Sequence, residues 1–120
     1  MKALFDTNIV VVFLNGAPEA RDEIARYREK AISIITWMEV LVGTDDEVAD
    51  ATRVFLDTLV VLPLDGEIAA RAVALRREHR VKLPDAIIWA SADAHSMLLV
   101  TRNTKDFPSN APGVRVPYRL

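Results

Sequence analysis

Carboxylate and amide side chains end short apolar runs at four separate places in the chain. The residues are Asp6, Glu39, Asp85 and the pair Asn103 and Asp106. Carboxylates at the ends of buried strands and the starts of helices are costly to place unless positive charge lies between them. If the four places converge in the fold, a divalent cation is the simplest group to lie between them. The residue types therefore predict a metal site built from oxygen ligands.

Each of these residues also has an explanation that involves no chemistry. Asp6 could cap the helix that follows it, and Asp85 follows Pro84 in a first helical turn, where a carboxylate suits the helix dipole. Thr36 and Glu39 have the spacing of a capping box, in which Glu39 would fold back on the Thr36 amide. No single segment is specific, so the argument for a site rests on their joint occurrence.

Positive side chains lie near the same segments. Arg102 and Lys105 flank Asn103, and we expect them to contact phosphate groups of a substrate. Five further cations precede Asp85 and could equally form a solvated helix face: Arg71, Arg76, Arg77, Arg80 and Lys82. The net charge of −2 does not favour nucleic acid, so contact with a polyanion would depend on a local patch or on metal.

Strands and helices that alternate along the chain must position these residues. Apolar runs predict five strands, at about 2–5, 31–35, 59–62, 97–100 and 114–116. Amphipathic or capped segments predict helices, at about 7–14, 18–30, 36–42, 45–58, 66–79 and 84–96. Continuously apolar strands separated by helices are typical of a parallel sheet covered on both faces. We therefore expect an α/β fold, a three-layer α/β/α sandwich with a central, mainly parallel five-stranded sheet.

One edge of such a sheet can collect the candidate residues. Ligands of open α/β sheets bind beyond the carboxyl ends of the strands. Asp6 and the loop after Val100 follow strand ends, whereas Glu39 and Asp85 lie near the starts of helices, so all four segments can reach one rim. The sequence has no internal repeat, low-complexity tract or linker, and we expect residues 1–120 to form one domain.

The composition limits the class of protein. The chain has 120 residues, of which 51% are hydrophobic and 27% charged, so it has the makings of a folded core and is not disordered. The absence of cysteine excludes disulfides and thiolate metal sites. The apolar runs are too short to cross a bilayer, and Asp6 interrupts the N-terminal run, which argues against a signal peptide. We expect a cytoplasmic protein without membrane contact.

Four motifs together resemble the PIN-domain ribonucleases, and within that family the VapC toxins of bacterial and archaeal toxin–antitoxin pairs. The motifs are Phe5-Asp6-Thr7-Asn8, Thr36-x-x-Glu39-Val40-Leu41-x-Gly43, Leu83-Pro84-Asp85-Ala86-Ile87-Ile88-Trp89-Ala90 and Leu99-Val100-Thr101-Arg102-Asn103-Thr104-Lys105-Asp106-Phe107. The resemblance implies a PIN-like fold, an endoribonuclease dependent on Mg²⁺ or Mn²⁺, a homodimer, and a VapB-like antitoxin that covers the site. The helices predicted at 18–30 and 45–58 could leave an apolar groove for an antitoxin helix, or could only complete the core.

The resemblance also assigns roles to the acidic residues. The three near-invariant carboxylates of the family match Asp6, Glu39 and Asp85, and its fourth position falls on Asn103. Asp106 lies in the same loop, so either Asn103 or Asp106 could complete the site. We expect Asp6 and Asp85 to bind Mg²⁺, with Mn²⁺ as the alternative, and Glu39 to orient or deprotonate the attacking water.

Two other classes of function fit parts of the sequence. A catalytically silent PIN module would bind RNA or a protein partner, although the three intact carboxylates argue against this interpretation. A haloacid-dehalogenase-like phosphatase would need a second aspartate two residues after the nucleophile, where this chain has Asn8. A measurement of metal binding would separate the silent module from an active nuclease.

Overall fold

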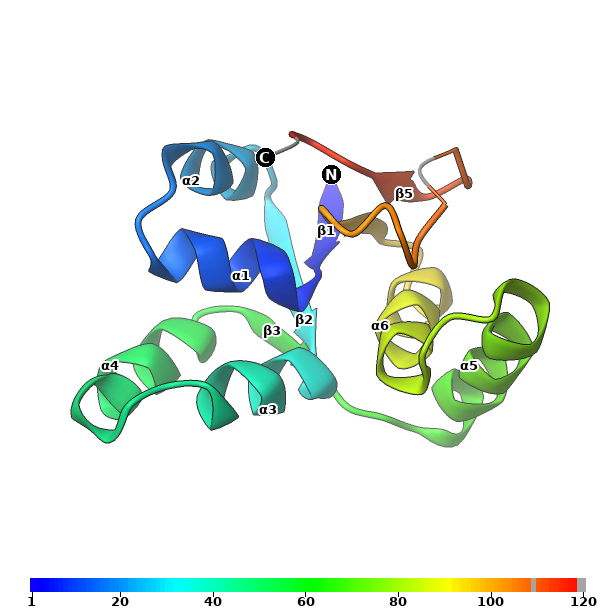
Figure 1. Ribbon diagram of the computed structural model, residues 1–120, viewed down its shortest axis with the longest axis horizontal. Coiled ribbons are helices and arrows are strands. Elements are labelled where there is room, and N and C mark those ends of the chain that lie inside the picture. Colours follow the sequence, from blue (N-terminus) through cyan, green and yellow to red (C-terminus); the bar gives the residue numbers. More distant parts are fainter. Residues whose placement is uncertain (109, 119–120) are drawn as a thin grey trace.

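The computed structural model describes residues 1–108 and 110–118, in which helices and strands alternate (Figure 1). The elements are β1 (Lys2–Phe5), α1 (Thr7–Leu14), α2 (Pro18–Ala25), β2 (Glu29–Ser33), α3 (Ile34–Val42), α4 (Asp46–Leu56), β3 (Val60–Leu62), α5 (Gly66–His79), α6 (Leu83–Ala94), β4 (Leu98–Val100) and β5 (Val114–Arg115). None of these helices is both long and apolar enough to span a membrane.

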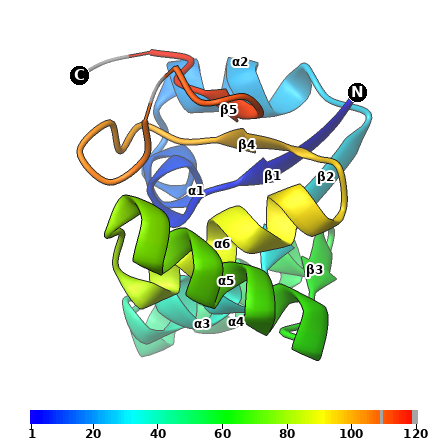
Figure 2. The same cartoon turned by 90° about the vertical axis from the view of Figure 1, so that its right-hand side faces the viewer.

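The strands form a single twisted layer between two layers of helices. Their order in the sheet is β3-β2-β1-β4-β5, and each of the four pairings is parallel. Helices α5 and α6 cover one face, while α1 to α4 lie on the other (Figures 1 and 2). The architecture confirms the predicted α/β/α sandwich with a five-stranded parallel sheet.

The central strand β1 contributes to both hydrophobic cores. Leu4 packs with Ala86 and Leu99 in the core beneath α5 and α6, whereas Ala3 and Phe5 belong to the core on the side of α1 to α4. All five side chains are fully buried. Alternation of side chains between two covered faces explains why this strand has a continuous apolar sequence. Burial of each large apolar side chain contributes roughly 1.5–3 kcal/mol to stability.

Helix α3 begins earlier than the sequence pattern predicts. Ser33 caps it, because the Ser33 hydroxyl oxygen accepts a hydrogen bond from the backbone N–H of Ile35 at 3.0 Å. The strand predicted to reach Ile35 therefore ends at Ser33, and the helix starts at Ile34. Thr36 lies inside the helix rather than at its cap, so the capping-box interpretation of Glu39 is wrong.

The charged helix predicted at 18–30 is shorter than expected. Helix α2 ends at Ala25, and Glu29 already belongs to β2. Glu29 is opposite Lys2 of β1 in the sheet, and their side chains form an ion pair at 3.5 Å. Pairing with β1 therefore determines the conformation of this charged segment, whose own composition favours a helix or a turn.

Candidate active site

Asp6 lies at the carboxyl end of β1 and caps helix α1. Its Oδ1 accepts a hydrogen bond from the N–H of Thr7 at 2.8 Å, and its Oδ2 accepts from Thr101 Oγ1 at 2.7 Å and from Asn8 Nδ2 at 3.1 Å. The residue is only 3% exposed. Burial raises the pKa of Asp6 despite these three hydrogen bonds, and the charge of Glu39 raises it further. Asp6 is therefore a helix cap and also a buried acid whose charge is poorly compensated.

Glu39 projects from α3 toward the first turn of α1. Its Oε1 accepts a hydrogen bond from Thr7 Oγ1 at 2.7 Å, and the same hydroxyl lies 3.0 Å from Thr36 Oγ1. The two threonines thus join α1 and α3 at the point where Glu39 approaches Asp6. This contact replaces the fold-back on the Thr36 amide that a capping box would require.

Asp85 occupies the first turn of α6, as the sequence predicts. The pKa of Asp85 is raised to about 6. Burial is the largest cause, followed by the charges of Asp6 and Asp106, a hydrogen bond with Asp106, and the charge of Glu39. Four carboxylates from separate parts of the chain therefore act on one another at the carboxyl edge of the sheet.

Asn103 and Asp106 lie in the loop after β4 and hold each other. Asn103 Nδ2 donates to Asp106 Oδ2 at 2.8 Å, and the N–H of Asp106 donates to Asn103 Oδ1 at 3.1 Å. The N–H of Asn103 also donates to Thr101 Oγ1 at 3.0 Å, the hydroxyl that donates to Asp6. The structure thus brings the Asp106 carboxylate to Asp85, while the Asn103 amide is engaged with Asp106.

Of the two predicted phosphate contacts, Arg102 is the more firmly held. Its backbone N–H donates to Asn8 Oδ1 at 3.2 Å, and its guanidinium carbon lies 5.3 Å from the centroid of the Tyr118 ring. Lys105 lies on the same loop and is exposed. Both cations therefore belong to the loop that carries Asp106.

Two of the cations on α5 have structural roles. Arg71 pairs with Asp93 of α6 at 2.7 Å and with Glu67 at 3.3 Å, and Arg76 donates to the carbonyl oxygen of Val81 at 2.7 Å. These contacts connect α5 with α6 and with the turn between them. The interpretation as an ordinary helix face therefore explains Arg71 and Arg76, and the absence of a contact with RNA stays a prediction.

Three uncharged side chains at the site were not among the predicted site residues. Thr7 positions Glu39, while Asn8 and Thr101 both bond to Asp6. Thr101 is fully buried, which is unusual for a polar residue and is explained by its bond to Asp6. A sequence signal exists for all three, because each follows the end of a buried strand, where a polar side chain faces the same rim as the carboxylates.

The donor set at this rim has the chemistry that a hard divalent cation prefers. Asp6, Glu39, Asp85 and Asp106 offer carboxylate oxygens, and Mg²⁺ binds one or two carboxylates while it keeps several waters. Within the described part of the chain, no three Asp, Glu or His side chains converge closely enough to enclose an ion by themselves. The residues fit a cation that completes its coordination with water, and such a cation would relieve the repulsion that raises the pKa of Asp85.

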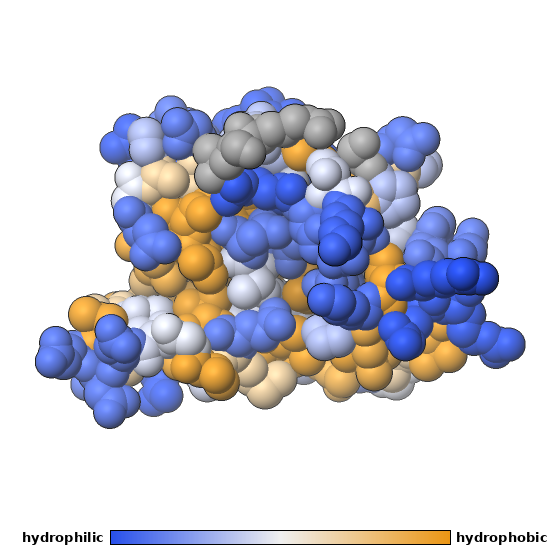
Figure 3. All heavy atoms as spheres, viewed as in Figure 1, coloured by the Kyte–Doolittle hydropathy of each residue, from blue (hydrophilic) through white to orange (hydrophobic). Residues whose placement is uncertain are grey.

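An apolar hollow of about 430 Å³ opens beside Glu39, between α1, α3 and α4. Apolar residues gather on the left of the face drawn in Figure 3, where Figure 1 shows α1, α3 and α4. The lining includes Val11, Leu14 and Val48 and no residue of α2. The prediction of a groove between helices 18–30 and 45–58 is therefore wrong in its partners, because α4 lines the hollow with α1 and α3 and not with α2.

Comparison with known proteins places the chain in a family. The PIN domain family profile matches residues 3–111. Ribonuclease VapC10 of Mycobacterium tuberculosis is 31% identical to this chain over 113 residues, which cover 88% of this chain and 85% of that protein. This chain belongs to the PIN domain family, as its motifs predict.

Solved structures show the same fold over the full length. A chain of a toxin–antitoxin complex from Klebsiella pneumoniae is 46% identical, with a TM-score of 0.94 and coverage of 99% of this chain and 100% of that one. A chain of DNA-bound VapBC from Salmonella typhimurium is 24% identical, with a TM-score of 0.77 and coverage of 99% and 98%. The second likeness shows a shared fold alone, and both agree with the predicted PIN-like architecture.

Proposed function

We propose that this protein is a metal-dependent endoribonuclease and the toxin of a toxin–antitoxin pair. The observation that carries the proposal is the convergence of Asp6, Glu39, Asp85 and Asp106 at one rim of the sheet, where burial and the other three carboxylates raise the pKa of Asp85 to about 6. Such a cluster costs stability and repels RNA until a cation binds it. An arrangement that is unfavourable for folding and suited to a hard cation is typical of a functional site.

The names of the similar proteins support the substrate and the biological role. The relative from Mycobacterium tuberculosis is a ribonuclease, and the structure that is 46% identical belongs to a toxin–antitoxin complex. The four-carboxylate site and the two cations on its loop agree with RNA as a substrate, because hydrolysis of a phosphodiester needs charge neutralisation and a nucleophile at neutral pH.

In the proposed mechanism, Asp6 and Asp85 bind Mg²⁺, with Mn²⁺ as the alternative. An ion held by these two residues would supply a water of lowered pKa and would neutralise charge on the phosphate oxygens. Glu39, held by the Thr7 hydroxyl at 2.7 Å, orients or deprotonates the attacking water. Asp106 completes the acidic set, and Asn103 keeps it in place through the hydrogen bonds that join the two residues.

Arg102 and Lys105 are proposed to contact phosphates on either side of the cleaved bond. Both lie on the loop that carries Asp106, one of the four carboxylates of the site. An arginine offers a planar fork of donors that matches phosphate oxygens, whereas a lysine acts as a point charge. Positive charge on this loop thus compensates for the overall charge of −2 where RNA would lie.

The hollow between α1, α3 and α4 is the proposed binding site of a VapB-like antitoxin. Its apolar lining suits one face of an amphipathic helix, and Glu39 lies at its edge. A basic residue next to such a helix would reach the carboxylates and replace the metal ion there. The homodimer stays a prediction, and light scattering with and without the antitoxin would measure it.

RNA cleavage with and without metal tests the proposed activity. We expect cleavage in Mg²⁺ or Mn²⁺, none after treatment with EDTA, and recovery when either ion is restored. Asp85→Asn protein, purified in the same way, is the control for contaminating nuclease. Full activity after rigorous removal of metal would contradict the mechanism. Binding of RNA without cleavage under all these conditions would favour the catalytically silent PIN module.

A further inference from the structure

The segment 114–118 near the C-terminus lies against the candidate active site. It begins as β5, which pairs with β4 at the edge of the sheet, and then runs toward α2 (Figures 1 and 2). The carbonyl oxygen of Arg115 accepts a hydrogen bond from the N–H of Thr101 at 3.0 Å. Thr101 in turn donates to Asp6, so the segment is two contacts away from a candidate metal ligand.

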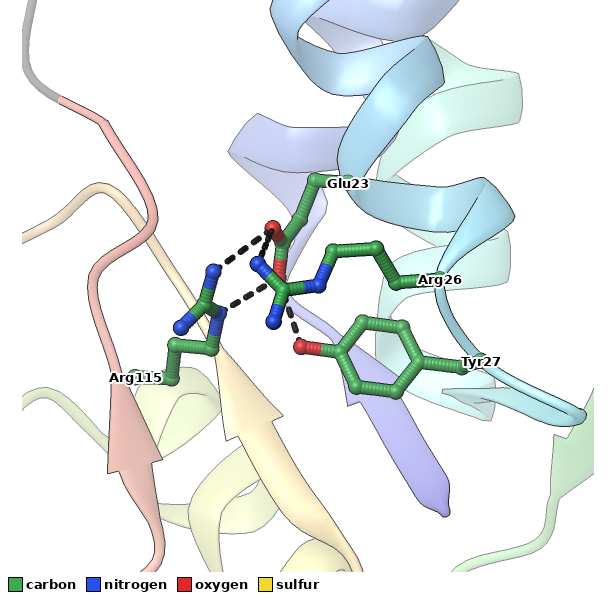
Figure 4. Close-up of polar contacts among 4 residues, drawn as sticks. All are labelled: Glu23, Arg26, Tyr27 and Arg115. Atoms are coloured by element: carbon green, nitrogen blue, oxygen red, sulfur yellow. Dashed lines mark hydrogen bonds and ion pairs between the residues drawn. The ribbon is translucent and has the colours of Figure 1, made fainter.

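Arg115 anchors this segment to α2 through Glu23. Arg115 Nε and Nη2 donate to the two oxygens of Glu23 at 2.7 and 3.0 Å, and Tyr27 Oη donates to the same carboxylate at 2.6 Å (Figure 4). Burial by itself would raise the pKa of Glu23, but the hydrogen bonds from Arg115 and Tyr27 hold it below its usual range. A partly buried, bidentate, charged pair of this kind fixes the orientation of the two side chains as well as their distance.

Tyr118 follows the anchor and reaches the active-site loop. The Arg102 guanidinium carbon lies 5.3 Å from the centroid of its ring, within the range of a cation–π contact. Arg102 Nε and Tyr118 Oη are both buried, and neither finds a hydrogen-bond partner within the described ranges. Among the described residues, the aromatic face of Tyr118 is therefore the contact that holds this side chain, while the bond to Asn8 fixes the Arg102 backbone.

A cation held in this way is ready to bind an anion. The Tyr118 ring attracts the guanidinium without using its N–H groups, which a carboxylate partner would occupy. The backbone N–H of Arg102 donates to Asn8, and Asn8 donates to Asp6, so the backbone of Arg102 is two contacts from the acidic rim. Restriction of the side chain before binding lowers the entropy lost when it meets its ligand.

We propose that Tyr118 is a positioning residue, whose ring holds Arg102 where the guanidinium contacts a phosphate of the RNA substrate. The pair of Glu23 and Arg115 fixes the segment so that Tyr118 reaches Arg102. This inference rests on the proposed ribonuclease function and adds to it a residue outside the four acidic motifs.

Steady-state cleavage by five proteins tests this role: wild type, Tyr118→Leu, Tyr118→Phe, Arg102→Gln and the double variant Arg102→Gln/Tyr118→Leu. Loss of the ring should raise KM roughly two- to thirty-fold, the span of cation–π contacts, and leave kcat largely unchanged. Tyr118→Phe keeps the ring and should keep the wild-type KM. The double variant should have the KM of Arg102→Gln alone, because Tyr118 acts through Arg102. An unchanged KM in Tyr118→Leu, or additive effects in the double variant, would overturn the proposal.

A second measurement needs no RNA and separates this inference from the proposed function. In ¹⁵N-labelled protein, the Nε–H of Arg102 should exchange slowly with solvent in the wild type and in Tyr118→Phe, and faster in Tyr118→Leu. Fast exchange in the wild type would overturn the positioning contact, whatever the activity. A wild-type protein that cleaves no RNA in Mg²⁺ or Mn²⁺, with slow Nε–H exchange, would instead overturn the proposed function. Thermal unfolding and circular dichroism of each variant verify the fold.

Discussion

Two carboxylates of this protein have almost the same exposure to solvent, but their pKa values shift in opposite directions on folding. Asp6 is 3% exposed and Glu23 is 4% exposed. Burial raises the pKa of Asp6, and the nearby Glu39 adds to the rise. The pKa of Glu23 is lowered instead, because hydrogen bonds from Arg115 and Tyr27 outweigh its burial (Figure 4). The partners of a buried acid, together with its burial, therefore decide whether its charge stabilises the fold or remains uncompensated.

The surroundings of the two acids extend this contrast. Asp6 shares its rim with three other carboxylates, and the resulting repulsion is a cost that the rest of the fold must offset. Glu23 instead has two arginines and a tyrosine of the same chain as partners for its charge. In the proposed function an external cation would complete the first region, whereas the charge of Glu23 already has its partners within the chain.

The largest expected effect comes from Asp85→Asn at the uncompensated rim. Cleavage should fall by at least the order of 10²-fold, because the substitution removes a proposed metal ligand. The free energy of unfolding should stay the same or rise, since one of the repelling charges is gone. RNA cleavage and urea unfolding measure the two quantities. Retained cleavage, or a clear loss of stability, would contradict the contrast between the two regions.

Asp6→Asn should abolish cleavage in the same way but stabilise less. The Asp6 carboxylate accepts hydrogen bonds from Thr7, Asn8 and Thr101, and an amide cannot accept all of them. The gain from removed repulsion is therefore partly cancelled.

The next largest effect should come from substitution of Asp106, and substitution of Asn103 should have a smaller one. Asp106→Asn removes a carboxylate next to Asp85 and should lower cleavage and Mg²⁺ affinity by roughly 10- to 100-fold, as for residues that support metal ligands. Asn103→Ala removes only the brace and should cost less. Titration calorimetry with Mg²⁺ and cleavage rates compare the two variants. A larger loss of Mg²⁺ affinity in Asn103→Ala would make the amide the fourth member of the site.

The fold was predictable wherever local signals agree with the final structure. Helix α5 was predicted at 66–79 and is observed at Gly66–His79, because Asp65 caps it and Arg80 ends it in a left-handed conformation. The first residues of β2 were missed because their conformation depends on pairing with β1. That pairing is a non-local interaction which the composition of residues 29 and 30 does not reveal.

In the candidate site, too, local sequence signals were predictive and contacts between side chains were not. The motifs around Asp6, Glu39 and Asp85 could be read from the chain, since each carboxylate follows an apolar run. The choice between Asn103 and Asp106 could not, because it depends on side-chain hydrogen bonds within one loop. The ion pair of Glu23 could not be predicted from the sequence, since its partner Arg115 lies near the other end of the chain.

Glu23→Gln should lower stability with little effect on kcat. The amide keeps the shape of the carboxylate but weakens the charged hydrogen bonds from Arg115 and Tyr27, which predicts a loss on the order of 2 kcal/mol in the free energy of unfolding. Asp22→Asn on the same helix is the matched control. Asp22 is exposed and pairs with Arg21 at 3.6 Å, so its loss should leave stability nearly unchanged. Equal effects of the two variants in urea unfolding would show that the anchor is not special.

The smallest expected effect is a pair of opposite pH dependences in the presence of EDTA. The pKa of Asp85 rises from 3.8 to about 6 on folding, so its contribution to stability is full below about pH 4 and is lost as the pH rises through about 6. The pKa of Glu23 falls below 4.5 on folding, so its contribution is full above 4.5 and is lost as the pH falls through the lower folded-state value.

Urea unfolding of the wild type, Asp85→Asn and Glu23→Gln at a series of pH values measures both slopes. The free energy of unfolding of Asp85→Asn should fall less toward neutral pH than that of the wild type. The difference should be only about 1 kcal/mol, because Asp85 is half-buried and solvent screens its charge. Some decline should remain, since the raised pKa of Asp6 acts in the same direction. Glu23→Gln should flatten only the acid side. With saturating Mg²⁺, the free energy of unfolding of the wild type should rise toward neutral pH rather than fall, because a bound cation favours the ionised carboxylates. If Mg²⁺ leaves the fall in unfolding free energy toward neutral pH unchanged, these acids do not bind the cation.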